Sequence, residues 1–97
     1  MNMQNLMAQA RRLQNDMERI NNQIEAATYI GENSAIRVEI LGKYEIKKLE
    51  ILNDEVLTDK ELLEDMLLLA VNDGLNKIKK EKEEKLGKFT NGLGGLF

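Results

Sequence analysis

The segment that decides the fold of this chain is TDKELLEDMLLLAVNDGLNKIKKEKEEKLG, residues 58–87. It predicts one long helix with two unlike halves, because residues 62–71 are mostly apolar and residues 77–85 are almost all charged. Thr58 and Glu61 fit a capping box at its start, and Gly87 fits a stop at its end. A helix of this span is about 40 Å long. We therefore expect the apolar half to anchor in a core and the charged half to project beyond it.

Residues 3–27 predict a second long helix. Its apolar positions are separated by alternating steps of four and three residues: Leu6, Ala10, Leu13, Met17, Ile20, Ile24 and Ala27. This seven-residue repeat is the period at which helices pair as coiled coils. The stripe can pack on its own domain or on a second copy of the chain, and both can hold along different parts of it.

Between the two helices the hydrophobic period changes to two, which predicts strands. Residues 27–30 are β-prone, and residues 31–34 have the composition of a turn. Residues 36–40 alternate apolar and charged side chains, as in a half-buried strand. We expect a two-residue hairpin turn at Gly42-Lys43, with Gly42 at positive φ.

Residues 44–51 follow as a third strand. Simple alternation places Leu49 and Ile51 on one face and Tyr44 and Ile46 on the other. The fold class is therefore α+β, an α-β-β-β-α chain with a small antiparallel three-stranded meander flanked by two long helices. Residues 1–87 are expected to form a single domain, and residues 88–97 a mobile glycine-containing tail.

Charge is unevenly distributed along the 97 residues. The net charge is −3, but residues 53–75 carry seven acids and one lysine, while residues 76–97 carry six lysines and three glutamates. This separation permits a local anionic partner despite the acidic composition. No apolar run approaches a membrane span and the first residues do not resemble a signal peptide, so we expect a cytoplasmic protein that does not enter a membrane.

The composition argues against an enzyme. The chain has no histidine and no cysteine, so the commonest general base, the strongest common nucleophile and thiolate metal sites are all missing. We expect neither a metal site nor a cofactor, because no metal-loop spacing or phosphate loop is present. Asn72-Asp73 is interpreted as a polar interruption that hydrogen-bonds to the sheet or its loops, in preference to a ligand site.

Taken together, the chain resembles the YbaB/EbfC family of bacterial nucleoid-associated proteins. The resemblance covers nearly the whole sequence and rests on the order and spacing of Asn5-Leu6-Met7, Gln9-Ala10, Met17, Gly31, Val38–Gly42, Ile51, Leu57, Leu63-Glu64-Asp65 and Ala70-Val71-Asn72-Asp73. It implies an α-β-β-β-α protomer, a homodimer shaped like open tweezers, and binding to duplex DNA of the nucleoid with little sequence specificity.

The sequence departs from the family pattern at two positions. Asn33-Ser34-Ala35 stands where relatives usually have several glycines, and Gly74 stands where alanine is frequent. Glycine inside a helix costs about 1 kcal/mol relative to alanine. Gly74 therefore indicates either a bend between the two halves of the helix or close packing against a neighbour.

The lysines of residues 77–88 are the main candidates for contact with DNA phosphates. Clustered lysines release counterions from DNA, which supplies most non-specific affinity. The same lysines alternate with glutamates at i,i+4 spacing, which is typical of a solvated helix face. Composition alone favours the solvated face, whereas the family resemblance favours DNA contact through Lys77, Lys79, Lys80, Lys82 and Lys85, joined by Arg11 and Arg12, with Arg19 extending the footprint.

Two functional hypotheses follow. In the first, a homodimer built through Leu13, Met17, Ile20, Tyr44 and Ile46 binds the backbone of double-stranded DNA, and a replication or repair protein can be a further partner. In the second, the chain is an adaptor that recruits another protein through the seven-residue stripe and the acidic residues 54–65. Salt dependence separates the two, because phosphate contacts weaken steeply with salt and apolar contacts do not.

Overall fold

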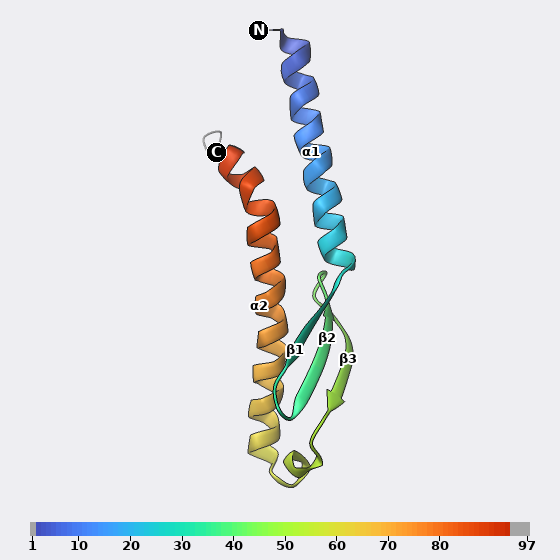
Figure 1. Ribbon diagram of the computed structural model, residues 1–97, viewed down its shortest axis with the longest axis vertical. Helices are drawn as coiled ribbons and strands as arrows, with labels where there is room; N and C mark the ends of the chain where they lie inside the picture. Colours follow the sequence, from blue (N-terminus) through green and yellow to red (C-terminus); the bar gives the residue numbers. More distant parts are fainter. Residues whose placement is uncertain (1, 94–97) are drawn as a thin grey trace.

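The computed structural model describes residues 2–93 as a single elongated unit. Its elements are α1 (Met3–Ala26), β1 (Thr28–Glu32), β2 (Ile36–Leu41), β3 (Glu45–Ile51), the short 3-10 helix η1 (Asp54–Thr58) and α2 (Lys60–Leu93). The strands form one antiparallel sheet in the order β1-β2-β3, so the predicted α-β-β-β-α fold is confirmed. Figure 1 shows the sheet beside the first half of α2, and α1 above the sheet, beside the second half of α2.

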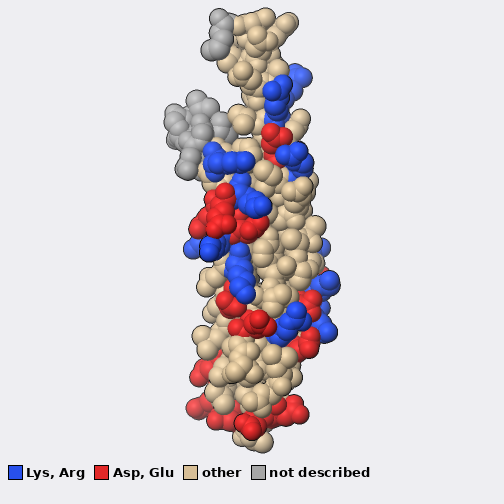
Figure 2. Space-filling model, in the orientation of Figure 1, with Lys and Arg blue, Asp and Glu red and all other residues tan. Residues whose placement is uncertain are grey.

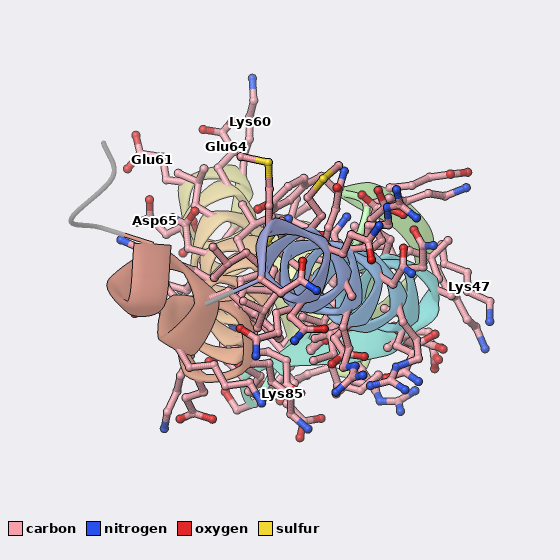
Figure 3. The ribbon with its side chains drawn as sticks, turned by 90° about the horizontal axis from the view of Figure 1, so that it is seen from above. Lys47, Lys60, Glu61, Glu64, Asp65 and Lys85 are labelled. Atoms are coloured by element: carbon pink, nitrogen blue, oxygen red, sulfur yellow. The ribbon has the colours of Figure 1, made fainter. Side chains whose placement is uncertain are left out.

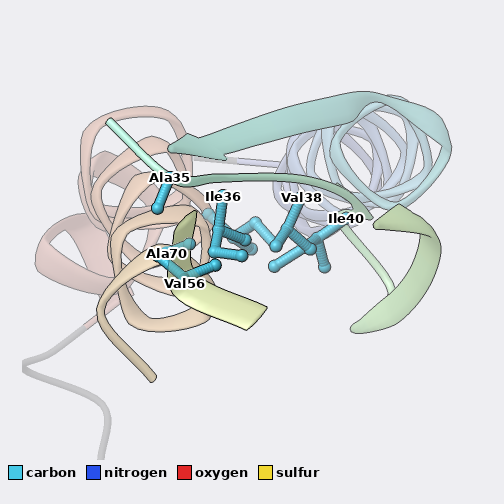
Figure 4. Packing of buried hydrophobic residues seen from close by; sticks show 7 residues of the cluster. Ala35, Ile36, Val38, Ile40, Val56 and Ala70 are labelled. Atoms are coloured by element: carbon cyan, nitrogen blue, oxygen red, sulfur yellow. The ribbon is translucent and has the colours of Figure 1, made fainter. Parts of the chain in front are cut away.

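The core lies between the sheet and the first half of α2. β2 turns every second side chain toward the helix, and Ile36, Val38 and Ile40 are at most 1% exposed. They pack with Val56 of η1 and Ala70 of α2, as Figure 4 shows. The apolar half of the long helix is therefore the anchor that the sequence predicted, because its buried face matches the alternating face of β2.

Two glycines allow α2 to lie directly on β1. A Cβ atom added to Gly31 would lie 2.0 Å from the carbonyl oxygen of Ala70 and 2.5 Å from the nitrogen of Gly74. A Cβ atom on Gly74 would lie 2.7 Å from Cδ1 of Ile40. Of the two interpretations of Gly74, close packing against a neighbour is the one that the structure supports.

The N-terminal cap of α2 differs from the prediction. Oδ1 of Asp59 accepts a hydrogen bond from the backbone N–H of Leu62 at 3.1 Å, as a cap residue does. Thr58 instead ends η1, where its hydroxyl donates to the carbonyl oxygen of Glu55 at 2.9 Å. The capping box predicted at Thr58 is wrong. Burial of Val56 places the residues before α2 in η1, so the cap of α2 is one residue later than predicted.

The predicted stop at Gly87 is also wrong. α2 continues to Leu93, so residues 88–93 of the expected tail are helical, and residues 94–97 lie outside the described part of the chain. Two turns of helix beyond the charged segment are retained because Phe89 is buried against α1. This packing offsets the weak helix propensity of Gly87.

The hairpin between β2 and β3 has three turn residues rather than two. Leu41 pairs with Glu45, and the N–H of Tyr44 donates to the carbonyl oxygen of Leu41 at 2.8 Å. The positive φ, 67°, belongs to Tyr44, whereas Gly42 has no positive φ. Gly42 is required for another reason, since a Cβ there would lie 1.8 Å from the carbonyl oxygen of Ile24 in α1.

A β-bulge changes which side chains of β3 share a face. Ile40 pairs with Ile46 and Glu39 pairs with Lys48, so Lys47 is an extra residue in β3. Ile46 therefore lies on the same face as Leu49 and Ile51, not on the opposite face as simple alternation predicted. These three side chains extend the core face of the sheet beyond α2 and are about half exposed, at 52%, 45% and 39%.

The turn between β1 and β2 is organised by Asn33. Its Oδ1 accepts from the N–H groups of Ala35 and Ile36, each at 3.0 Å, and its Nδ2 donates to the carbonyl oxygen of Met66 in α2 at 2.9 Å. An asparagine can form such a turn because its side chain replaces backbone hydrogen-bond partners.

Candidate nucleic-acid interface

The charged side chains divide along the long axis of the molecule, which measures 69 Å. Figure 2 shows acidic side chains gathered at the lower end, where η1 and the start of α2 lie, and basic side chains over the upper half. Figure 3 shows, in a view along this axis, that Glu61 and Glu64 extend from one side of the molecule and Lys85 from the other. Only the basic half has the charge needed to meet an anionic partner.

Lys79 and Lys80 are the most available of the predicted lysines. Both side chains are exposed, and within residues 2–93 neither forms an ion pair or a side-chain hydrogen bond. The i,i+4 spacing allows four pairs: Lys77–Glu81, Lys79–Glu83, Lys80–Glu84 and Glu81–Lys85. Only the last is within ion-pair distance in this part of the chain, at 3.6 Å. Most lysines of this segment therefore have no glutamate of the same segment within ion-pair distance.

Lys77 and Lys82 are turned toward the sheet. Nζ of Lys77 donates to the carbonyl oxygen of Ile30 at 2.6 Å and lies 3.4 Å from Oδ2 of Asp73. Nζ of Lys82 donates to the hydroxyl of Tyr44 at 3.1 Å and lies 4.4 Å from the centre of its ring. Both side chains thus stabilise the junction of α2 with the sheet. They would have to give up these contacts to bind a ligand.

Asp73 completes this junction. Its Oδ2 accepts from the N–H of Glu32 in β1 at 3.1 Å, so Asp73 and Lys77 together satisfy two backbone groups of an edge strand. This hydrogen bond from Glu32, together with the neighbouring charge of Lys77, holds the pKa of the Asp73 carboxyl below its ordinary value. For Asp73, the interpretation as a polar residue that hydrogen-bonds to the sheet is confirmed.

The three predicted arginines lie on α1. Arg11 and Arg12 are exposed and make no ion pair among the described residues, whereas Nη2 of Arg19 lies 3.5 Å from Oδ1 of Asp16. Arg11 and Arg12 are therefore available for an anion on α1, which lies beside the second half of α2 in Figure 1.

The predicted dimer residues fall in two places. Leu13, Met17 and Ile20 line a groove between α1 and the end of α2, beside Phe89. Tyr44 and Ile46 lie at the start of β3, in the hairpin and in the sheet. The sequence analysis did not single out Phe89, although it follows the buried Ile78 by three full helical turns, a spacing that places both on one side of a helix.

Residues 2–93 contain no cluster of three or more acidic side chains placed to hold a metal ion. In the same range, no helix combines the length and the apolar character that crossing a membrane needs.

The sequence profile of the YbaB/EbfC DNA-binding family matches residues 1–93, from α1 to the last described turn of α2. The chain belongs to the YbaB/EbfC family. A nucleoid-associated protein of Lactococcus lactis is 43% identical over 96 residues, which cover 96% of this chain and 97% of the relative. One from Enterococcus faecalis is 37% identical over 98 residues, which cover 98% and 94%.

The fold recurs in an uncharacterised protein of Helicobacter pylori whose crystal structure is known. The two structures align with a TM-score of 0.67 over 87% of this chain and 91% of the other, at 21% sequence identity. The YbaB/EbfC architecture is thus retained where most residues differ. The family is described by DNA binding. The composition agrees with this description, since the chain has neither histidine nor cysteine.

Proposed function

We propose that this YbaB/EbfC protein is a nucleoid-associated homodimer that binds the sugar–phosphate backbone of duplex DNA with little sequence specificity. The observation that carries the proposal is that Lys79 and Lys80, in the charged half of α2, are exposed and form no ion pair or side-chain hydrogen bond within residues 2–93. Exposed lysines that release counterions provide affinity without reading bases. Lys85, Arg11 and Arg12 extend the same contact, and Lys77 and Lys82 contribute less because they are bonded to the sheet.

The open face of β3 supports the homodimer. α2 packs on β1 and β2, and Ile46, Leu49 and Ile51 remain half exposed on the face that forms the core elsewhere. A protomer this thin, 14 Å in its shortest dimension, buries little apolar surface by itself. A second copy related by a two-fold axis would cover this face and place two basic arms on one molecule.

The experiment is a titration of random-sequence duplex DNA at about 50 and 200 mM salt. The variant is Lys79→Ala/Lys80→Ala, and the matched control is Lys47→Ala/Lys60→Ala, which removes the same charge from β3 and from the acidic end (Figure 3). We expect the first variant to weaken binding to every sequence and to lower the salt slope by roughly one unit for each phosphate that a lysine no longer neutralises. We expect the control to bind nearly as the unmodified protein does.

Two results would contradict this proposal. Equal weakening in both double variants would assign the effect to net charge and not to the basic arm. Absence of DNA binding at low salt would favour the adaptor hypothesis, in which the acidic residues 54–65 and the stripe of α1 recruit another protein. A replication or repair protein as partner stays a prediction.

A further inference from the structure

The apolar stripe of α1 is covered at one end and open at the other. Ile24 is 3% exposed because the hairpin and α2 pack on it, whereas Leu6, Met7 and Leu13 are 44%, 52% and 46% exposed. The same seven-residue repeat runs through both parts. The open part is the half of α1 nearest the N-terminus, which extends beyond the sheet in Figure 1. It is far from the exposed face of β3, so it is a second and separate apolar surface.

The residues that flank this stripe carry almost no charge. Gln9 and Gln14 line the groove beside Leu6, Ala10 and Leu13, and Arg11 and Arg12 are not among the lining residues. An uncharged flank suits another helix, because flanking charges set partner choice in paired helices and none here would repel an identical helix. It does not suit DNA, whose phosphates need basic groups at the contact.

The rim of the groove carries both signs of charge. Asp16 and Arg19 line it from α1, and Lys88 lines it from α2. Asp16 lies 3.5 Å from Arg19 of its own helix, which leaves Lys88 as the base without an acid beside it in the groove. Across a two-fold axis, Lys88 of each copy can lie against Asp16 of the other copy, so the rim is compatible with its own copy. The repeat, the neutral flank and the mixed rim all favour the same occupant, a second copy of this chain.

We propose that the open stripe of α1, from Leu6 to Leu13, pairs with the same stripe of another protomer and joins one homodimer to the next. This pairing is distinct from the contact at β3. It rests on the proposed function in one respect, that the contact at β3 forms the homodimer. Because Arg11 and Arg12 lie outside the groove, they stay free for DNA after pairing. Joined dimers would therefore carry DNA-binding arms in two places and bring two duplexes together.

The chain has no cysteine, so single cysteines introduced into it report the contact directly. The probe variants are Leu6→Cys, Ala10→Cys and Leu13→Cys on the stripe, and the control is Ala8→Cys, which is exposed on the same helix but does not line the groove. After mild oxidation, we expect at least one stripe variant to form linked chain pairs and the control to form none. Light scattering under native conditions should then give the linked protein the mass of at least two dimers.

Three outcomes would overturn the proposal. The stripe variants could fail to link, the control could link equally well, or the linked protein could have the mass of one dimer, which would place the arm contact inside the dimer. A second variant, Leu6→Gln/Ala10→Gln, changes exposed positions that line the groove and should leave the circular dichroism spectrum unchanged. We expect it to raise the concentration at which dimers join by about tenfold or more.

DNA binding provides the readout that separates this proposal from the proposed function. Leu6→Gln/Ala10→Gln should bind a single duplex as the unmodified protein does and should lose the ability to retain a second, labelled duplex on an immobilised first one. Normal retention of the second duplex by this variant would refute the stripe contact while DNA binding stands. Absence of single-duplex binding by the unmodified protein would refute the proposed function instead.

Discussion

Nζ of Lys77 lies 2.6 Å from the carbonyl oxygen of Ile30, although the two residues are 47 positions apart in the chain. This hydrogen bond, with the one from Glu32 to Asp73, holds β1 against α2. The bond from Lys77 to Ile30 gives this lysine a structural role, which the run of lysines in the sequence does not indicate. Lys77 and Lys80 should therefore respond differently to substitution.

We expect Lys77→Met to lower the free energy of unfolding by about 1 kcal/mol, the usual net value of one hydrogen bond, because the carbonyl of Ile30 loses its donor. The decrease in DNA affinity should be smaller than for Lys80→Ala, whose side chain makes no such bond. Urea unfolding and DNA titration measure the two effects. Unchanged stability combined with a DNA defect as large as that of Lys80→Ala would show that Lys77 acts mainly on DNA.

Gly31→Ala should be strongly destabilising. The added Cβ would lie 2.0 Å from a backbone oxygen of α2, which cannot move without displacing the helix. Overpacking of this kind costs about 1–3 kcal/mol, and the absence of a flexible neighbour places Gly31 at the upper end. Gly87→Ala is the matched control, since no atom of the described residues lies within 4 Å of its Cβ position and alanine favours the helix by about 1 kcal/mol. Thermal unfolding should move in opposite directions for the two variants, and a shift in the same direction would contradict the close packing of α2 on β1.

The cap of α2 gives a third prediction. Asp59→Ala removes the acceptor for the N–H of Leu62 and should cost about 1 kcal/mol. Thr58→Ala removes only an exposed bond to the carbonyl of Glu55 and should cost less. Chemical unfolding of both variants tests the order. A larger destabilisation for Thr58→Ala would restore the capping box predicted from the sequence.

Acid should weaken the junction of β1 and α2. The pKa of the Asp73 carboxyl is lowered in the folded protein, so its contribution to stability is present above the unfolded pKa of about 3.9 and is lost as pH falls through the lower folded pKa. Asp73→Asn should therefore be less stable than the unmodified protein at neutral pH, and the difference in melting temperature should shrink below about pH 4.

The matched control for this pH series is Glu64→Gln, an exposed position in α2 with no hydrogen bond or ion pair among the described residues. The pKa of Glu50 is also lowered, by its bond to Lys48, so some acid sensitivity should persist in Asp73→Asn. A difference between the unmodified protein and Asp73→Asn that stays constant with pH would contradict the role of the charged carboxylate.

Periodicity predicted the elements of this fold, because each buries one face and the spacing of apolar residues reports that face directly. The errors arise where tertiary contacts outweigh local preference. Thr58 and Asp59 are both good cap residues, and burial of Val56 decides between them. Gly87 is a usual stop, and burial of Phe89 carries the helix through it.

The bulge at Lys47 and the placement of the lysines could not be obtained from spacing. A bulge adds one residue to a strand without any signal in the spacing of apolar residues. The side chains before it then lie on the opposite face from the one that simple alternation predicts, which is why the predicted face of Ile46 is wrong. The lysine run predicted where positive charge lies but not which side chains it leaves available. That distinction depends on Ile30 and Tyr44, which are distant in sequence and adjacent in space.

α2 is one continuous helix from the core to the basic arm, and this continuity fixes a dimension of the proposed dimer. From Gly74 to Lys88 the helix extends about 21 Å, so a tilt of about 5° at the Gly31–Gly74 contact would displace the arm by about 2 Å. The width of the gap between the two arms is therefore set by how closely α2 lies on β1, where the two chain segments meet at the glycines Gly31 and Gly74. If the arms hold a duplex between them, a change in the width that they accommodate would require substitutions at Gly31 or Gly74, which do not contact the DNA.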